Sequence, residues 1–292
     1  MRHPRLGLLD TLQADENGFR RLAMLGWLKG LLCAVGFILP SCSFAADVVL
    51  GVASPAQRTS MKKVDHTPFD QMLKEYVNDR GMVDYRGWNA SASAKKKLDA
   101  YINSLSRSTS AGANKNDQLA FWINAYNAIT IKGILREYPT SSIRNHTAKL
   151  WGYNIWKNLK LRFAGKQLSL EDIEHELLRK MREPRIHFAI VCASIGCPKL
   201  RNEAYVPEKL DAQLTDNAKA FFADRDKFRF SGSRFEVSPI LKWFAEDFGD
   251  GQSQQLKTIR PYLPAKAQKA VDSGSVRISY LSYDWGLNDQ AK

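Results

Sequence analysis

The sequence has few cysteines and histidines, and it lacks the common nucleic-acid-binding motifs. Only four cysteines and five histidines occur among 292 residues. No helix-turn-helix, zinc-finger or RNP pattern is present, so nucleic-acid binding is not expected. Internal repeats and low-complexity tracts are also missing, which argues against repeat architectures and extended disorder. We expect most of the chain to fold around a sizeable core.

Dense blocks of basic charge are missing as well, although the chain is basic overall. Lysine and arginine total 43 against 30 acidic residues, giving a net charge of +13. No dense basic block is longer than KKK at residues 95–97. This scatter favours a generally solvated surface. A second hypothesis is attraction to an anionic partner, such as an envelope polymer, a peptide or lipid headgroups.

The candidate membrane segment is near the start of the chain, and its apolar run is interrupted. A helix that spans a bilayer needs about 20 apolar residues, but Lys29 breaks this run and Pro40 closes it. We therefore predict a cleaved signal peptide at 1–46, with an unusually polar extension at 1–19, and a periplasmic or secreted protein. Lipidation at Cys42 is the alternative, which Pro40 disfavours.

Removal of the leader would leave only two cysteines in the mature protein. Cys33 and Cys42 lie in the leader, and Cys192 and Cys197 remain. Two cysteines in an oxidising compartment can pair. A Cys192–Cys197 disulfide would close a short loop, so its entropic contribution would be modest. One hypothesis is therefore a non-catalytic envelope binding or scaffold module that carries this disulfide.

The remaining pattern predicts a linker at 47–66 and a single α+β domain at 67–290. Expected helices cover 68–79, 93–106, 117–139, 170–181 and 208–223, and expected strands or hairpins cover 156–170, 185–191, 227–237 and 276–288. The 170–181 helix has Ser169 and Asp172 in capping positions. The 117–139 helix is apolar nearly all round. We expect a mixed or antiparallel sheet packed on this long buried central helix.

Two amides on the central helix are candidate site residues. Asn124 and Asn127 are three residues apart and share a face. A buried amide without a partner costs about 1–3 kcal/mol, so both should be hydrogen-bonded. They either tie a neighbouring loop to the helix or line a pocket and orient a base or a ligand.

The stretch HFAIVCASIGCP at 187–198 holds the main candidates for chemistry. In a regular strand, His187 and Cys192 would point to opposite faces. Cys197 follows Gly196, where the chain can turn back toward His187 or toward Cys192. A thiol–imidazole pair is therefore easier with Cys197, and a nucleophilic cysteine needs such a partner to lower its pKa.

Zinc binding is a further alternative for the same region. His175, His187, Cys192 and Cys197 together form an acceptable zinc ligand set. Their order and spacing match no standard zinc finger, and His175 lies on a helix between two glutamates. We therefore predict no metal site and no cofactor.

Six stretches, in this order along the chain, resemble the domain of unknown function 547 family. They are GMVDY (81–85), DQLAFWINAYNAITI (117–131), SIR (142–144), GKQLSLEDIEHELLR (165–179), PRIHFAIVCASIGCPKLR (184–201) and YDWGLN (283–288). The resemblance implies an exported bacterial protein. It also marks a set of distinctive polar positions: Asn124, Tyr126, Asn127, His175, His187, Cys192, Ser194, Cys197 and Asp284. Asp284 either reaches the site or caps a turn.

The order of helix and strand is also similar to papain-like and transglutaminase-like folds. In those folds a cysteine begins the central helix, but residues 117–139 contain none. If the protein is an enzyme, we expect a thiol-dependent amide or peptide hydrolase, or an acyltransferase. Cys197 or Cys192 would attack and His187 would be the base, with Asn124 or Asn127 orienting the imidazole. The remaining residues of the expected pocket are His175, Tyr126, Ser194 and Asp284.

Overall fold

The computed structural model describes residues 47–52, 58–148 and 153–291. The predicted signal peptide and the alternative lipidation at Cys42 lie outside the described residues. All described residues belong to one unit of the chain, Phe44–Lys292. Both helices and strands occur in it, which confirms the α+β class. Within the described part of the chain, no helix combines the length and the apolar character needed to cross a bilayer.

The central helix is α5 (Lys115–Glu137), and it is buried along most of its length. It starts two residues earlier than the sequence indicated. Asn114 accepts a hydrogen bond from the Asp117 backbone N–H at 3.0 Å, and the Asp117 carboxylate accepts one from the Asn114 N–H at 2.8 Å. This reciprocal capping satisfies two backbone donors that the first turn leaves free, and so fixes where the helix begins.

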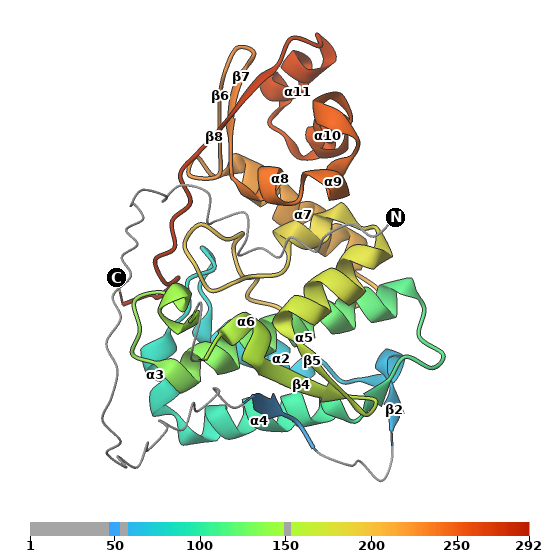
Figure 1. The fold of residues 1–292 in the computed structure, drawn as a ribbon, viewed down its shortest axis with the longest axis vertical. Helices are drawn as coiled ribbons and strands as arrows, with labels where there is room; N and C mark the ends of the chain where they lie inside the picture. The colour runs from blue at the N-terminus through green and yellow to red at the C-terminus, as the bar shows by residue number, and fades with distance from the viewer. Residues whose placement is uncertain (1–46, 53–57, 149–152, 292) are drawn as a thin grey trace, which may run out of the picture. The chain divides into compact units, whose positions relative to one another are not determined.

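Three helices that precede α5 in the chain form one side of the core (Figure 1). They are α2 (Thr67–Tyr76), α3 (Tyr85–Ala90) and α4 (Ala92–Ser106). Helices α3 and α4 pack on α5, and α2 packs on α3 and α4. The predicted helices at 68–79 and 93–106 are therefore confirmed, whereas the short α3 was not expected.

Two small sheets complete this part of the molecule. In the first, β4 (Leu159–Phe163) lies between the parallel β1 (Val48–Leu50) and the antiparallel β5 (Lys166–Ser169). Alternate residues of β4 are buried, and the strand packs on α4 and α5, which confirms a sheet against the central helix. The second sheet pairs β2 (Thr59–Ser60) with β3 (Ser108–Thr109). Strands β1 and β2 show that part of the predicted linker is structured.

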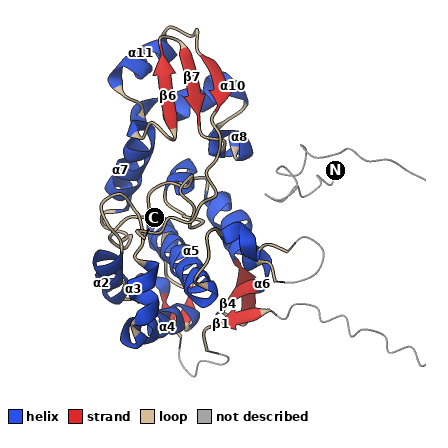
Figure 2. Cartoon of the chain, turned by 90° about the vertical axis from the view of Figure 1, so that its left-hand side faces the viewer, coloured by secondary structure: helices blue, strands red, loops and turns tan. Residues whose placement is uncertain are grey.

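The C-terminal region has its own sheet (Figure 2). Strands β6 (Phe228–Ser231) and β7 (Arg234–Val237) form the predicted hairpin, and β8 (Arg277–Tyr280) joins β7 in parallel. Helix α7 (Leu210–Ala223) leads into this sheet. The crossover from β7 to β8 contains four α-helices: α8 (Ile240–Trp243), α9 (Ala245–Phe248), α10 (Gly251–Ile259) and α11 (Ala265–Asp272).

The predicted strand at 185–191 is wrong. The chain forms a 3-10 helix, η5 (Pro184–Phe188), and then continues without regular structure. Proline fits the first turn of a helix, and Glu183 caps this one by accepting from the Arg185 N–H at 3.1 Å. A short apolar run is ambiguous between a strand and a buried helix. The strand alternation that separated His187 from Cys192 therefore does not apply.

The preceding helix is also irregular. Its predicted cap is confirmed, since Ser169 Oγ accepts from the Asp172 N–H at 3.0 Å and Asp172 accepts from the Ser169 N–H at 2.9 Å. The body is a wide π-helix, η3 (Asp172–Leu178), followed by a single 3-10 turn, η4 (Arg179–Met181). Such widened turns are often found at functional sites.

Candidate functional site

The two candidate amides of α5 hold backbone segments in place. Asn124 donates to the Tyr205 carbonyl at 2.8 Å and accepts from the Tyr205 N–H at 2.9 Å. Asn127 donates to the Ala189 carbonyl at 3.0 Å and accepts from the Val191 N–H at 2.9 Å. The prediction that both amides find partners is confirmed. Asn127 therefore fixes the segment that leads into the first cysteine of the loop.

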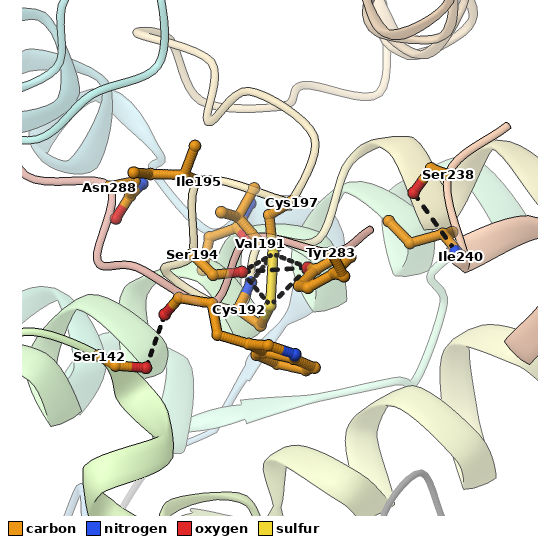
Figure 3. The surroundings of a disulfide bond; sticks show 12 residues. Ser142, Val191, Cys192, Ser194, Ile195, Cys197, Ser238, Ile240, Tyr283 and Asn288 are labelled. Atoms are coloured by element: carbon orange, nitrogen blue, oxygen red, sulfur yellow. Dashed lines mark hydrogen bonds between the residues drawn. A yellow bond between two sulfur atoms is a disulfide. The ribbon is translucent and has the colours of Figure 1, made fainter. Parts of the chain in front are cut away.

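A disulfide joins Cys192 to Cys197, with a Cα–Cα separation of 6.3 Å. Three donors also converge on Cys197 Sγ: the Cys192 backbone N–H at 3.0 Å, the Tyr283 hydroxyl at 3.1 Å and the Ser194 hydroxyl at 3.3 Å. The same two hydroxyls lie 3.2 and 3.3 Å from Cys192 Sγ (Figure 3). Burial raises the pKa of the Tyr283 phenol, so this group stays protonated and remains a donor at neutral pH.

The backbone of this loop is held by bonds that do not involve sulfur. The Ile195 N–H donates to the Gly286 carbonyl and the Gly196 N–H to the Asp284 carbonyl, both at 2.7 Å. The buried ammonium of Lys227 donates to the Ile195 carbonyl at 2.7 Å. Glycine is required at 196, because a Cβ there would lie 2.9 Å from the Asp284 carbonyl oxygen. The C-terminal segment therefore fixes the loop independently of the disulfide.

Cys197 lines a cavity of about 600 Å³. This volume is typical of a small-molecule site. Three basic side chains and two aspartates belong to its lining. The polar lining residues are Arg80, Ser194, Lys199, Asp224, Asp226, Lys227 and Asn288.

A second polar cluster surrounds His187, which is buried within η5. Its Nε2 lies 2.7 Å from Asp247 Oδ2, and its ring stacks on Phe244 with centroids 4.1 Å apart. Arg179 donates to both oxygens of Asp247, from Nε at 2.6 Å and from Nη2 at 3.0 Å. Arg179 Nη1 also lies 2.8 Å from His175 Nδ1. The guanidinium thus organises one carboxylate and one imidazole.

The electrostatics of this cluster favour a neutral His187 and an ionised Asp247. Burial lowers the pKa of His187, and the hydrogen bond to Asp247 opposes this only in part. Burial alone would raise the pKa of Asp247, but hydrogen bonds from His187 and Arg179 outweigh it and the pKa is lowered. Burial and the nearby Arg179 charge lower the pKa of His175.

The predicted thiol–imidazole pair is not made in this structure. Among the described residues, neither His187 nor His175 forms a hydrogen bond with either sulfur, and neither Asn124 nor Asn127 bonds to His187. His187 lines a different cavity, of about 730 Å³. Its charged residues are Arg179, Lys180, Arg182, Glu183, Glu246 and Asp247. This cavity and the one beside Cys197 share no lining residue.

Tyr126 belongs to a third buried contact. Its hydroxyl donates to Glu174 Oε2 at 3.1 Å. Burial raises the pKa of Glu174 to about 7, and the hydrogen bond from Tyr126 only partly offsets this. Burial raises the pKa of Tyr283, and the Glu174 charge raises it further.

Asp284 caps a turn. Its Oδ1 accepts from the Gly286 N–H at 2.7 Å, while its carbonyl receives the Gly196 N–H. The side chain therefore acts in the turn, which was one of the two predicted roles. Ser194, by contrast, contacts both sulfurs.

No zinc site is formed by the predicted ligand set. Cys192 and Cys197 are bonded to each other, and Arg179 occupies Nδ1 of His175. Within residues 47–52, 58–148 and 153–291, no group of three or more His, Cys, Asp or Glu side chains is arranged to hold a metal ion. The zinc hypothesis therefore gains no support.

Sequence reasoning missed several partners that complete these clusters. Asp247 is 60 residues from His187, and Tyr283 is 91 residues from Cys192, so no local spacing connects them. His175 and Arg179 are four residues apart, a spacing that places two side chains on one helix face, and this was a usable signal. A charged residue on the inner side of an amphipathic helix points to a buried ionic contact.

Residues 110–222 match the model of a family described as "Protein of unknown function, DUF547". The resemblance seen in the sequence is thereby confirmed. Comparison with curated proteins and with solved structures gave no match. The likeness to papain-like folds therefore stays a prediction. Most candidate site residues lie inside the matched segment, but Lys227, Asp247 and Tyr283 come from the chain after it.

Proposed function

We propose that this DUF547 protein is an exported thiol–disulfide exchange enzyme of the bacterial envelope. The working group is the Cys192–Cys197 pair, with Cys197 as the attacking thiolate in the reduced form. The observation that carries the proposal is the convergence of three donors on Cys197 Sγ beside a cavity. The leader expected at 1–46 supports export to a compartment in which disulfides form.

Hydrogen bonds from these three donors stabilise a thiolate at Cys197 more strongly than they stabilise a disulfide sulfur. A disulfide sulfur is a weak hydrogen-bond acceptor. A thiolate carries a full charge, and hydrogen bonds to the charged form of a group favour that form. The Cys192 N–H and the hydroxyls of Ser194 and Tyr283 should therefore lower the pKa of Cys197. A lowered pKa is the usual mark of a reactive cysteine.

The loop geometry supports a reversible pair over a purely structural disulfide. Its backbone is bonded to the C-terminal segment and to Lys227, so the two sulfurs should remain neighbours after reduction. A disulfide across only five positions adds little loop-closure entropy. The bond is therefore dispensable for holding the loop, and it is free to open and close.

The reaction balances as a two-electron exchange. The Cys197 thiolate attacks one sulfur of a substrate disulfide, forms a mixed disulfide and expels a thiolate that takes the Cys192 proton. The Cys192 thiolate then attacks Cys197 Sγ and expels the second substrate thiolate, which takes a proton from water. The substrate disulfide is reduced to two thiols, and the protein dithiol is oxidised to its disulfide.

Redox titration of the native protein tests this proposal. Protein incubated in dithiothreitol buffers should gain two free thiols without unfolding and lose them on reoxidation. Reduced Cys192→Ser protein should form a stable mixed disulfide at Cys197, and reduced Cys197→Ser protein should react far more slowly. A disulfide that opens only in denaturant would contradict the proposal and favour the non-catalytic binding or scaffold module.

Thiol-dependent amide or peptide hydrolysis is a second candidate. It is favoured by the same donors on Cys197 and by the His187–Asp247 pair, in which a carboxylate orients an imidazole. It is disfavoured by the separate cavities of His187 and Cys197. Amide substrates should be assayed with fully reduced protein. Hydrolysis that is lost in both Cys197→Ser and His187→Ala would favour this candidate.

A further inference from the structure

The cavity beside Cys197 contains two cations without carboxylate partners among the described residues. Arg80 and Lys199 are both exposed and line this cavity. The described contacts of Arg80 involve only its backbone, and Lys199 Nζ lies 3.4 Å from the Asp79 carbonyl oxygen. Neither side chain has a carboxylate within ion-pair distance in the described part of the chain.

The acidic residues that line the same cavity already have ion-pair partners. Asp224 Oδ2 lies 3.6 Å from Lys227 Nζ, and Asp226 Oδ1 lies 3.6 Å from Arg229 Nη2. Lys227 also donates a hydrogen bond to the Ile195 carbonyl. The charge left over in the cavity is therefore positive, and it comes from Arg80 and Lys199.

We infer that this cavity binds a low-molecular-weight disulfide that carries carboxylates near its sulfur atoms. The inference rests on the proposed thiol–disulfide exchange and adds its substrate class. The volume of about 600 Å³ suits a small molecule. Cys197 lines the same cavity as Arg80 and Lys199. A carboxylate held by either cation would therefore keep the attached disulfide in the cavity that contains the attacking sulfur.

The two cations serve both binding and reactivity. Unpaired positive charge in a cavity concentrates anionic ligands and repels cationic ones. Nearby cations also lower a thiol pKa. Both effects weaken as salt is added, because these side chains are exposed and therefore screened. A neutral disulfide benefits from the lowered thiol pKa but not from the attraction of anionic ligands. A comparison of probes that differ in charge therefore isolates the effect on binding.

Three disulfide probes of different charge test the inference on the full mature protein. Reduced protein is mixed with glutathione disulfide, which is anionic, with hydroxyethyl disulfide, which is neutral, and with cystamine, which is cationic. We expect glutathione disulfide to oxidise the protein about tenfold faster than cystamine at low salt, and this ratio to fall at high salt. Arg80→Glu combined with Lys199→Glu should reverse the order.

Lys266→Glu is the matched control, because Lys266 is exposed on α11 and is not part of this cavity. It should leave the order of the three probes unchanged. Equal rates for the three probes, or an order unaffected by the double variant, would overturn the inference and leave thiol–disulfide exchange intact. Oxidation by none of them would instead contradict the proposed function.

A fourth probe separates the free small molecule from an acidic protein segment. Its disulfide lies within an acidic peptide of about 30 residues, too large for a pocket in the small-molecule range. The inference predicts slower oxidation by this peptide than by glutathione disulfide. Equal or faster oxidation by the peptide would overturn the small-molecule assignment.

Discussion

The cavity beside Cys197 and the cavity beside His187 differ in how far their polar groups are paired with one another. At His187, the imidazole is bonded to Asp247, and both oxygens of Asp247 are bonded to Arg179. Beside Cys197, three donors meet a weakly accepting sulfur, and nearby cations lack carboxylate partners in the described part of the chain. The first arrangement suits a rigid structural cluster. The second suits a group that becomes charged during a reaction.

Both sites nevertheless start in the same short stretch of sequence. His187 and Cys192 are only five residues apart, and each is completed by a residue from the chain after the DUF547 match, Asp247 or Tyr283. The chain turns between them at the end of η5, where Asn127 holds the backbone. Closeness in sequence therefore does not place two candidate residues in one site.

Replacing Cys197 and His187 separately should have the largest and most distinct effects. Cys197→Ser should slow reaction of the reduced protein with glutathione disulfide by more than about 100-fold, because the attacking thiolate is lost. His187→Ala should leave that rate within about threefold, because it lies in another cavity. Stopped-flow oxidation kinetics give both numbers. A loss of similar size in both variants would mean that the two cavities act as one site.

His187→Ala should instead reduce stability. The change removes a fully buried ring and one hydrogen bond to an ionised carboxylate, so the free energy of unfolding should fall by about 3 kcal/mol. Urea unfolding of oxidised protein measures this. A change below about 0.5 kcal/mol, the range of ordinary surface substitutions, would contradict a structural role for the cluster.

Glu174→Gln should change how stability depends on pH. Burial raises the pKa of Glu174 from 4.5 to about 7. Below pH 4.5 the folded and unfolded states both keep this proton, so Glu174 carries no penalty. As pH rises from 4.5 to 7, the unfolded state releases the proton first and stability falls, with the full penalty of about 3 kcal/mol present above pH 7.

The variant should therefore be more stable than the parent at pH 8, by up to about 3 kcal/mol, with little advantage at pH 4. Urea unfolding at both pH values checks this expectation. Glu236→Gln is the control, since Glu236 is exposed on β7. Equal stability of the Glu174→Gln variant and its parent at pH 8 would remove the case for a buried carboxyl with a raised pKa.

Tyr283→Phe should have a smaller effect that is confined to the sulfur site. It removes one of the three donors on Cys197 and should raise the thiol pKa by about one unit in a Cys192→Ser background. The pH dependence of iodoacetamide alkylation reports the shift. Tyr280→Phe is the control, because Tyr280 is 48% exposed. An unchanged profile in Tyr283→Phe would remove the hydroxyl from the site.

The sequence was most informative where short-range patterns decide structure. The apolar character of residues 117–139 identified the central helix, and the expected burial of Asn124 and Asn127 correctly required partners for both. The strand at 185–191 was wrong because its apolar run fits a buried 3-10 turn equally well. Asp247 and Tyr283 could not be assigned, because only the tertiary fold brings them to His187 and the sulfurs.

The most direct test of the account is the pH dependence of Cys197 alkylation in native Cys192→Ser protein. An ordinary cysteine has a pKa of about 8.5. Three donors on the sulfur predict a half-maximal rate below about pH 7.5. A midpoint at or above about pH 8.5 would show that these donors do not stabilise a thiolate, and it would contradict Cys197 as the reactive group.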